Sequence, residues 1–300
     1  MAIGEIGLTS SMRSNLVSLQ TTARLLGSTE EKLATGKRVN TAVDSPASFF
    51  AAQGHTTRAN QLNGLKDNIN EAIQTVKAAD SGIKGVLSTI EALRGVLTQA
   101  RSAINDTVNS ATILAGAAAG GASGLTGQYN RLIGQLNNLV TDSSYKGTNF
   151  LTSGSVTLTV NFNENSSTSI VMSGFNSGAS GLAISGGGTT LTVASTTGNI
   201  TSANMDTTAE IDLAEATLNT AISTLQTRAS ELSANLSVLT ARQTFIGEMV
   251  NTLIIGATKL TEADTNEEGA NLLSLQTKQQ LGTTALSISS QAEQSILRLF

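Results

Sequence analysis

The sequence predicts a mainly α-helical protein, in which long antiparallel helices from the N- and C-terminal halves pair as in a coiled coil and carry a small β-rich insert at the tip. Three observations predict this class. Apolar residues repeat at alternating spacings of four and three over long stretches. The 300 residues include one proline and 3% aromatic residues, which favours long helices over a compact core. A stretch near the middle instead alternates apolar residues with threonine.

Residues 1–44 should hold one terminal helix. Its apolar residues form a narrow stripe, interrupted by Glu30, that requires a partner helix. Ser45 and Pro46 then match an N-cap and a first helical residue, so a second helix should run onward from Ala47. We call the first stripe the N-terminal seam; it consists of Met12, Leu16, Leu19, Ala23, Leu26 and Leu33.

A long helix is expected over residues 69–108. Asp80, Arg94 and Arg101 occupy positions of its apolar stripe, either as polar groups that set the register of a helix contact or as ordinary edge residues. The glycine-rich stretch 116–127 should end this helix, a shorter helix should follow around residues 132–140, and residues 145–150 resemble a β-turn or hairpin. The apolar members of the stripe are Ile69, Ile73, Val76, Ile83, Leu87, Ile90, Leu97, Ile104 and Val108.

The composition changes between residues 153 and 206. Val156, Leu158, Val160 and Phe162 alternate with Thr and Asn, and Gly/Ser clusters separate further short apolar runs. This pattern predicts a small β insert with generous turns, a thin core and high exposure.

A second long helix should begin at the capping-box spacing of Thr207 and Glu210. Among the stripe positions of this helix, only Gln243 is polar. The apolar positions are Leu218, Ile222, Leu225, Ala229, Leu232, Leu236, Leu239, Ile246, Val250, Leu253, Ala257 and Leu260.

The last helix should start at a second capping box, Thr265 to Glu268. We call its stripe the C-terminal seam; it consists of Leu281, Ala285, Ile288, Ala292 and Leu299. The nested order of helices and insert predicts three domains: residues 1–44 with 265–300, residues 45–152 with 207–264, and the insert 153–206. Ordering either end costs about 1–2 kcal/mol per residue, whereas each buried Leu or Ile returns about 1.5–3 kcal/mol. The two ends should therefore pair and also require contacts with other copies of the chain.

The composition excludes several functions. Charged residues are 13% of the chain and the net charge is −4, and no Lys/Arg cluster predicts a nucleic-acid partner. We expect no membrane span and no cleaved Sec signal at the N-terminus. Cysteine is absent and His55 is the only histidine, so we expect no catalytic residues, no metal site, no cofactor and no enzyme activity.

Both ends of the chain resemble a known family. Residues 8–16 (LTSSMRSNL) and 33–40 (LATGKRVN) resemble the N-terminal signature of bacterial flagellins. Residues 270–282 (ANLLSLQTKQQLG) and 295–300 (SILRLF) are similar to the C-terminus of that family. The resemblance covers roughly residues 1–150 and 205–300. Residues 44–50 (DSPASFF) depart from the Asp-rich, Ala/Gly-rich stretch of many members, which indicates an alphaproteobacterial-type variant.

This resemblance implies a structural subunit that polymerises into the flagellar filament, the helical propeller of bacterial motility, outside the cell. The terminal-helix domain would form an inner tube and the long-helix domain an outer tube, with the insert facing solvent. The seam residues would be the inter-subunit contacts. The implied partners are other copies in a helical homopolymer, the flagellar type III export apparatus and its chaperone, and the filament cap and hook-junction proteins.

Two alternatives remain at this point. A hook–filament junction protein would share the terminal seams but would adapt the filament instead of extending it. A flagellin-like surface adhesin would bind glycans through the β insert, although sugars usually stack on aromatic rings and the insert offers only Phe162 and Phe175.

Overall fold

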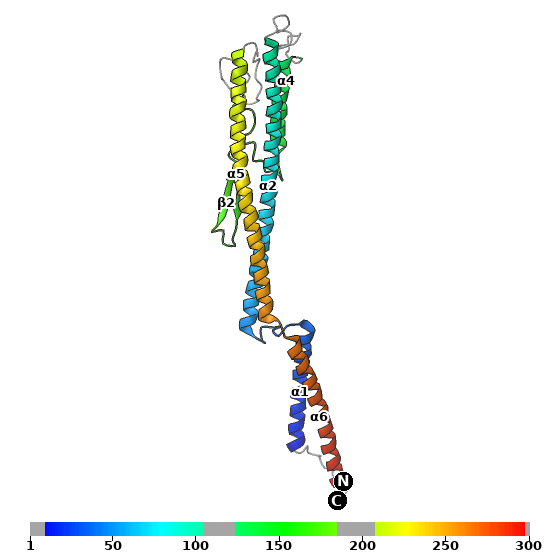
Figure 1. Cartoon of the computed structure of the whole chain (residues 1–300). Coiled ribbons are helices and arrows are strands. Elements are labelled where there is room, and N and C mark those ends of the chain that lie inside the picture. The colour runs from blue at the N-terminus through cyan, green and yellow to red at the C-terminus, as the bar shows by residue number, and fades with distance from the viewer. Residues whose placement is uncertain (1–9, 105–123, 185–207, 298–300) are drawn as a thin grey trace. The chain divides into compact units, whose positions relative to one another are not determined.

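The computed structural model describes residues 10–104, 124–184 and 208–297, and Figure 1 traces them. The chain divides into two compact units, Met1–Asn60 with Met249–Phe300, and Gln61–Glu248. The predicted fold class is confirmed, because five of the seven elements are helices and only two short strands lie between them in the described residues. Val108, Thr207, Leu299, residues 116–123 of the predicted glycine break and residues 185–206 of the predicted insert lie outside these ranges.

The two long helices are α2, Pro46–Ile104, and α5, Thr208–Thr261. In the second unit they run antiparallel, since Asn70 accepts a hydrogen bond from Gln243, and Arg101 binds Asp212 and Glu215 near the other end of α5. Every apolar stripe position predicted for α5 is buried or half-buried. The four–three spacing therefore identified the face of α5 that packs against its neighbours.

A third helix, α4, Leu125–Asp142, packs against α2 in the second unit. Its buried residues Tyr129, Ile133, Leu136 and Val140 recur every three or four positions and form one apolar face. A Cβ atom built on Gly85 of α2 would lie 2.7 Å from a methyl group of Leu139, so α4 approaches α2 closely there. Besides the predicted stripe, α2 therefore buries a second set of residues: Val86, Leu93, Val96 and Ala100.

The chain leaves α4 through a tight turn, as its composition predicted. Tyr145 and Thr148 exchange backbone hydrogen bonds of 2.9 Å in both directions. Between them Lys146 has φ 49° and Gly147 has φ 79°, the left-handed conformations of a type I′ turn. Next to this turn, the buried Asn149 side chain donates to the carbonyls of Val140 and Thr141 and so satisfies the C-terminal end of α4.

The two strands, β1 (Thr157–Asn161) and β2 (Ser169–Ser173), form an antiparallel hairpin in which Thr159 faces Val171. Val160 and Met172 are buried, so one face of the hairpin packs on the rest of the unit. The hairpin lies along the side of the long helices and not at their end, as Figure 1 shows for β2 beside α5. This differs from the expected place at the tip, because the apolar alternation of β1 gives the hairpin a face that the helices can cover.

The first unit contains the terminal helices, α1 (Ser10–Thr35) and α6 (Thr265–Leu297), which pack against each other. The same unit includes residues 46–60 of α2 and 249–261 of α5. Ser45 precedes Pro46 at the start of α2 as expected, and its carbonyl accepts the Phe49 amide at 2.9 Å. None of the described helices is long and apolar enough to cross a membrane.

Candidate functional site

The pairing of the two chain ends brings most of the N-terminal seam against α6. Met12 is buried, and Leu19, Leu26 and Leu33 are half-buried on the face of α1 that contacts α6. Thr29 is also buried there, which the apolar pattern could not show. The α6 face toward α1 consists of Leu272, Leu275, Gln279, Gly282 and Leu286, all half-buried.

Gly282 lets the two terminal helices approach closely. A Cβ atom built on this residue would lie 3.0 Å from both Cγ and Cδ2 of Leu19. The Leu19 side chain therefore fills the space that a larger residue of α6 would occupy. This close approach adds packing to the contact between the two helices.

The C-terminal seam lies on a different face of α6. Leu281 is 66% exposed and Ile288 is 62% exposed, and Ala285 and Ala292 are exposed as well. At 100° per residue, these positions lie about 130° around the helix from the residues that face α1. The two ends of the chain do pair, but the four described members of the C-terminal seam, Leu281, Ala285, Ile288 and Ala292, take no part in that contact and remain open to solvent.

Two members of the N-terminal seam lie at the edge of the α1–α6 contact. Leu16 is exposed at this edge, and Ala23, about two helical turns further along α1, is also exposed. An open groove of 360 Å³ runs between the two helices there. It is lined by Met12, Leu16, Thr283, Leu286, Ser287 and Ser290.

The third face of α6 is largely polar and uncharged, although the exposed Leu273 also lies on it. Gln276, Gln280, Ser287 and Gln291 are all exposed on it. The helix thus presents three different surfaces: one toward α1, one apolar and one polar. Such a division explains why a single amphipathic stripe does not describe α6.

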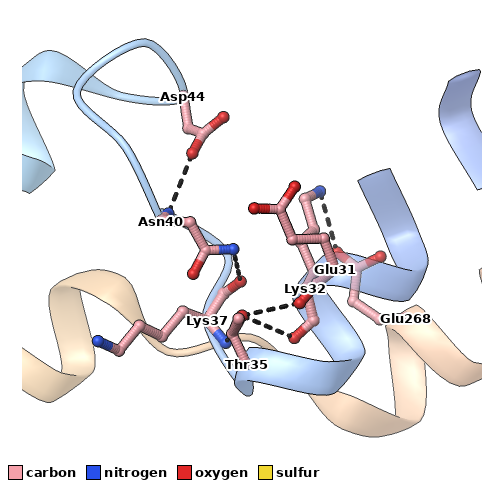
Figure 2. Close-up of polar contacts among 7 residues, drawn as sticks. All are labelled: Glu31, Lys32, Thr35, Lys37, Asn40, Asp44 and Glu268. Carbon is pink, nitrogen blue, oxygen red and sulfur yellow. Dashed lines mark hydrogen bonds and ion pairs between the residues drawn. The ribbon is translucent and has the colours of Figure 1, made fainter. Parts of the chain in front are cut away.

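An ion pair joins α1 to α6 at the base of the terminal pair. Lys32 Nζ lies 3.2 Å from Glu268 Oε1, and the Glu268 residue is buried (Figure 2). Glu268 was expected to close a capping box with Thr265, and that expectation is wrong. Asp264 is the cap, since its Oδ1 accepts the amides of Asn266 and Glu267. Glu268 pairs with Lys32 of α1 instead.

The segments that connect the terminal helices to the long helices are paired through their backbones. Arg38 and Val39 donate amide hydrogen bonds of 2.7 and 3.2 Å to the Thr261 carbonyl, and Ala263 donates to the Gly36 carbonyl at 3.0 Å. Gly36 has φ 67°, a left-handed conformation that suits glycine at the end of a helix. The connector pairing therefore begins immediately where α1 stops.

The turn before α2 is closed by Asp44. Its carboxylate accepts the Thr41 amide at 2.8 Å, the Thr41 hydroxyl at 3.1 Å and the Asn40 amide at 3.0 Å, and Figure 2 shows the bond from Asn40. These bonds, led by the Thr41 amide, hold the pKa of Asp44 below its usual value. The ionised form of Asp44 therefore stabilises the turn.

The polar residues on the long-helix stripe have different partners. Arg101 joins α2 to α5 through Asp212 and, at 2.9 Å, Glu215, so it acts across a helix contact. Asp80 and Arg94 instead pair within α2, with Lys84 and Glu91 respectively. Gln243, the one polar position of the α5 stripe, donates to Asn70 across the α2–α5 contact.

The described residues hold no grouping typical of catalysis. No three His, Cys, Asp or Glu side chains gather as a metal site requires in this part of the chain. The buried Tyr129 hydroxyl has no hydrogen-bond partner among the described residues, and burial raises its pKa. This phenol is therefore a poor acid.

The rings of both aromatic residues in the insert are partly covered by arginine side chains. The Arg242 guanidinium lies 5.0 Å from the centre of the Phe162 ring, and that of Arg228 lies 5.5 Å from the centre of Phe175. Both arginines belong to α5, so these contacts hold the insert on the helix. One face of each ring is thereby taken, which leaves a poor platform for a sugar.

Comparisons with known proteins agree with the arrangement of the two ends. Residues 6–157 match the family model described as the bacterial flagellin N-terminal helical region, and residues 215–300 match the bacterial flagellin C-terminal helical region. Over the full length of both chains, the sequence is 30% identical to flagellin FljN and 28% identical to flagellin FljO, both of Caulobacter vibrioides. It is 26% identical to a flagellin of Brucella melitensis, with 97% of each chain covered.

Proposed function

The chain belongs to the bacterial flagellin family, and from this premise we propose how its terminal helices contribute to assembly. As a flagellin it is a subunit of the flagellar filament, a structural protein of the extracellular flagellum with no catalytic role, and it self-assembles. We propose that the two seams are the surfaces through which α1 and α6 contact neighbouring copies inside the filament.

This proposal rests on one observation: the described residues of the C-terminal seam are exposed and do not face α1. Leu281 and Ile288 are large apolar side chains, and each is more than half exposed on a helix whose opposite flank is already packed on α1. An aligned set of exposed apolar residues marks a surface that another protein covers. In a protein that polymerises, the nearest such surface belongs to a second copy.

The N-terminal seam contributes in two ways. Met12, Leu19, Leu26 and Leu33 hold α1 against α6 and so keep the C-terminal seam outward. Leu16 and Ala23 lie at the exposed edge, where the groove between the helices could receive a side chain of a neighbour. Leu299 belongs to this surface by its spacing alone.

The same reasoning gives the domains their roles. Residues 1–44 and 265–300 form the inner domain, residues 45–152 and 207–264 form the outer domain, and the insert 153–206 faces solvent. The exposed apolar residues of α6 support the first role, and the exposed Thr157 and Thr159 of β1 support the last. The proposed partners besides other copies are the type III export apparatus with its chaperone, the filament cap and the hook-junction proteins, on the basis of family membership.

A paired substitution tests the C-terminal seam. The variant with Leu281→Gln and Ile288→Gln is mixed with filament fragments as seeds and observed by electron microscopy. We expect a soluble monomer that adds to no seed. Because both side chains are exposed, the free energy of unfolding should change by less than about 0.5 kcal/mol.

A matched control lies on the polar face of the same helix. Gln280→Asn with Gln291→Asn alters two exposed side chains that line no part of the groove, and this variant should form filaments of normal width. Normal growth of the Leu281/Ile288 variant from seeds would contradict the proposed role of the seam.

A further inference from the structure

The hairpin of the second unit has two open edges. In the part of the chain that the structure describes, β1 and β2 pair only with each other. At one end of the hairpin the Phe162 amide donates to the Thr168 carbonyl, and at the other end the Gly174 amide donates to the Val156 carbonyl. Hydrogen-bonded and non-bonded pairs alternate along antiparallel strands. The even-numbered residues of both strands therefore bond across the hairpin, and the odd-numbered residues do not.

The odd-numbered residues direct their backbone N–H and C=O groups away from the partner strand. These rows are Thr157, Thr159 and Asn161 on β1, and Ser169, Val171 and Ser173 on β2. Within the described ranges, no other segment forms backbone hydrogen bonds with either row. A row of unpaired backbone groups is a template on which a further strand can pair.

Neither edge carries the residues that usually prevent such pairing. Charged side chains and prolines commonly protect the edges of sheets. β1 reads TLTVN and β2 reads SIVMS, so neither strand contains a charged residue or a proline. Thr159 is exposed, and Val171, which faces it across the hairpin, is 60% exposed. Both edges are thus accessible and unprotected.

The β1 edge borders an open groove of 370 Å³. Residues Leu158–Asn161 form one wall, and the opposite side includes Leu65 and Ala72 of α2. The charged residues that line the groove are Glu71 and Lys146, which neutralise each other in an ion pair of 2.7 Å. The groove therefore suits an extended segment that brings no charge of its own.

We propose that the outer edge of β2 in one copy pairs with the β1 edge of the next copy, so that a sheet crosses the boundary between subunits. β2 is extended and uncharged, and both strands have five residues. The two edges are different surfaces, so the contact is heterologous and can continue from copy to copy.

The inference rests on the proposed function in one respect, since it requires that copies assemble. It adds a contact that is separate from the two seams. Only the edges of the hairpin take part in it. The outer face, with Thr157 and Thr159, stays in solvent.

The absence of cysteine from the chain allows a cross-linking test. Chains with Thr159→Cys are mixed with chains that carry Ser169→Cys, Val171→Cys or Ser173→Cys, one pair at a time, and filaments are grown from seeds and oxidised. Facing residues of paired strands have Cα atoms about 5.5 Å apart, and a disulfide needs about 4.4–6.8 Å. Each chain holds one thiol, so every disulfide joins two copies. We expect a dimer on a denaturing gel for the mixture whose register matches.

Two controls make the dimer specific. Filaments of each cysteine variant alone should give no dimer, because neither edge meets its own kind. Thr159→Cys mixed with Val238→Cys should give none either, although Val238 of α5 is 44% exposed. Normal filaments without a dimer in all three test mixtures would overturn the inference and leave the filament function intact. Failure of the unaltered protein to polymerise would instead count against the proposed function.

A second test removes one backbone donor from the β1 edge. Thr159→Pro lacks the N–H that faces away from β2, so the hydrogen bonds within the hairpin remain. This variant should raise the critical concentration for polymerisation by about tenfold or more. Thr159→Val keeps the N–H and should leave the critical concentration unchanged.

The unfolding transitions of both Thr159 variants are compared with that of the unaltered protein first. A normal critical concentration for folded Thr159→Pro protein would overturn the inference. A raised critical concentration without a dimer in any test mixture would show that something other than β2 covers the edge, and would overturn it as well.

Discussion

Single glycines decide how closely the segments after α4 approach α2. A Cβ atom on Gly82 would lie 2.8 Å from Ser143 Cβ and closer still to a methyl group of Leu151. By contrast, a Cβ on Gly95 of the same helix would meet nothing within 4 Å. The two positions share a helix and differ only in what surrounds them.

This contrast predicts opposite effects for the same substitution. Gly82→Ala should destabilise the protein by about 1–3 kcal/mol, because neighbouring atoms must move. Gly95→Ala should stabilise it by about 0.5–1 kcal/mol, because alanine loses less backbone entropy in a helix. Urea unfolding of the free protein, followed by circular dichroism, measures both. Equal stability of the two variants would show that the close approach at Gly82 is absent.

At the scale of the elements, one polar pair interrupts the contact between the long helices. Asn70 and Gln243 are both half-buried, and Gln243 donates to the Asn70 carbonyl oxygen. A polar pair in an apolar helix contact favours one register at some cost in stability.

Single and double substitutions should show how much the hydrogen bond between Asn70 and Gln243 contributes to stability. Gln243→Leu alone should cost about 1–3 kcal/mol, because the Asn70 amide is left without its partner. Asn70→Leu combined with Gln243→Leu should recover most of that loss, since both polar groups are gone. Chemical unfolding of the two single variants and the double variant gives the coupling. Additive losses in the double variant would contradict the hydrogen bond.

The predicted stripes were right on both long helices but incomplete. All apolar stripe positions of α5 are buried or half-buried, and the helix also buries Ile211, Ala214 and Ala221 outside that stripe. On α2 the pattern found Ile83 and Ile90 but missed Val86 and Leu93, which face a second helix. Once residues on two faces of a helix are apolar, a search for one stripe detects only the more regular of them.

The sequence pattern was also an incomplete guide to the contacts of the terminal helices. Spacing alone identified the C-terminal seam, yet it could not tell whether α1 or another copy covers it. The structure shows that α1 does not cover it, because Gly282 and Gln279, which lack the signal of an apolar stripe, form the contact with α1. Similarly, the capping box at Thr265 was wrong because Asp264, one residue earlier, is a stronger N-cap and leaves Glu268 free to pair with Lys32.

For the whole molecule, the exposed apolar surface predicts a difference between the free and the assembled chain. In the free monomer, amide hydrogens of α1 and α6 should exchange fast, because these helices bury few side chains. Amides of the second unit, around Ile83 and Leu136, should exchange slowly in both states, because these side chains are fully buried.

Hydrogen exchange with mass spectrometry of monomer and filament measures this difference. Protection of the terminal helices should appear only on polymerisation. A monomer whose terminal amides are as protected as those around Leu136 would contradict the dependence of the ends on neighbouring copies.

The three separate surfaces of α6 have a consequence for how this helix can change over generations. A substitution on the α1-facing surface, such as at Leu286, alters the internal partner, whereas one at Leu281 alters only what lies outside. Effects at well-separated, unconnected positions are usually additive. Lineages could therefore retune the outer surface without compensating changes in α1, while Gly282 and Leu19 would have to vary together.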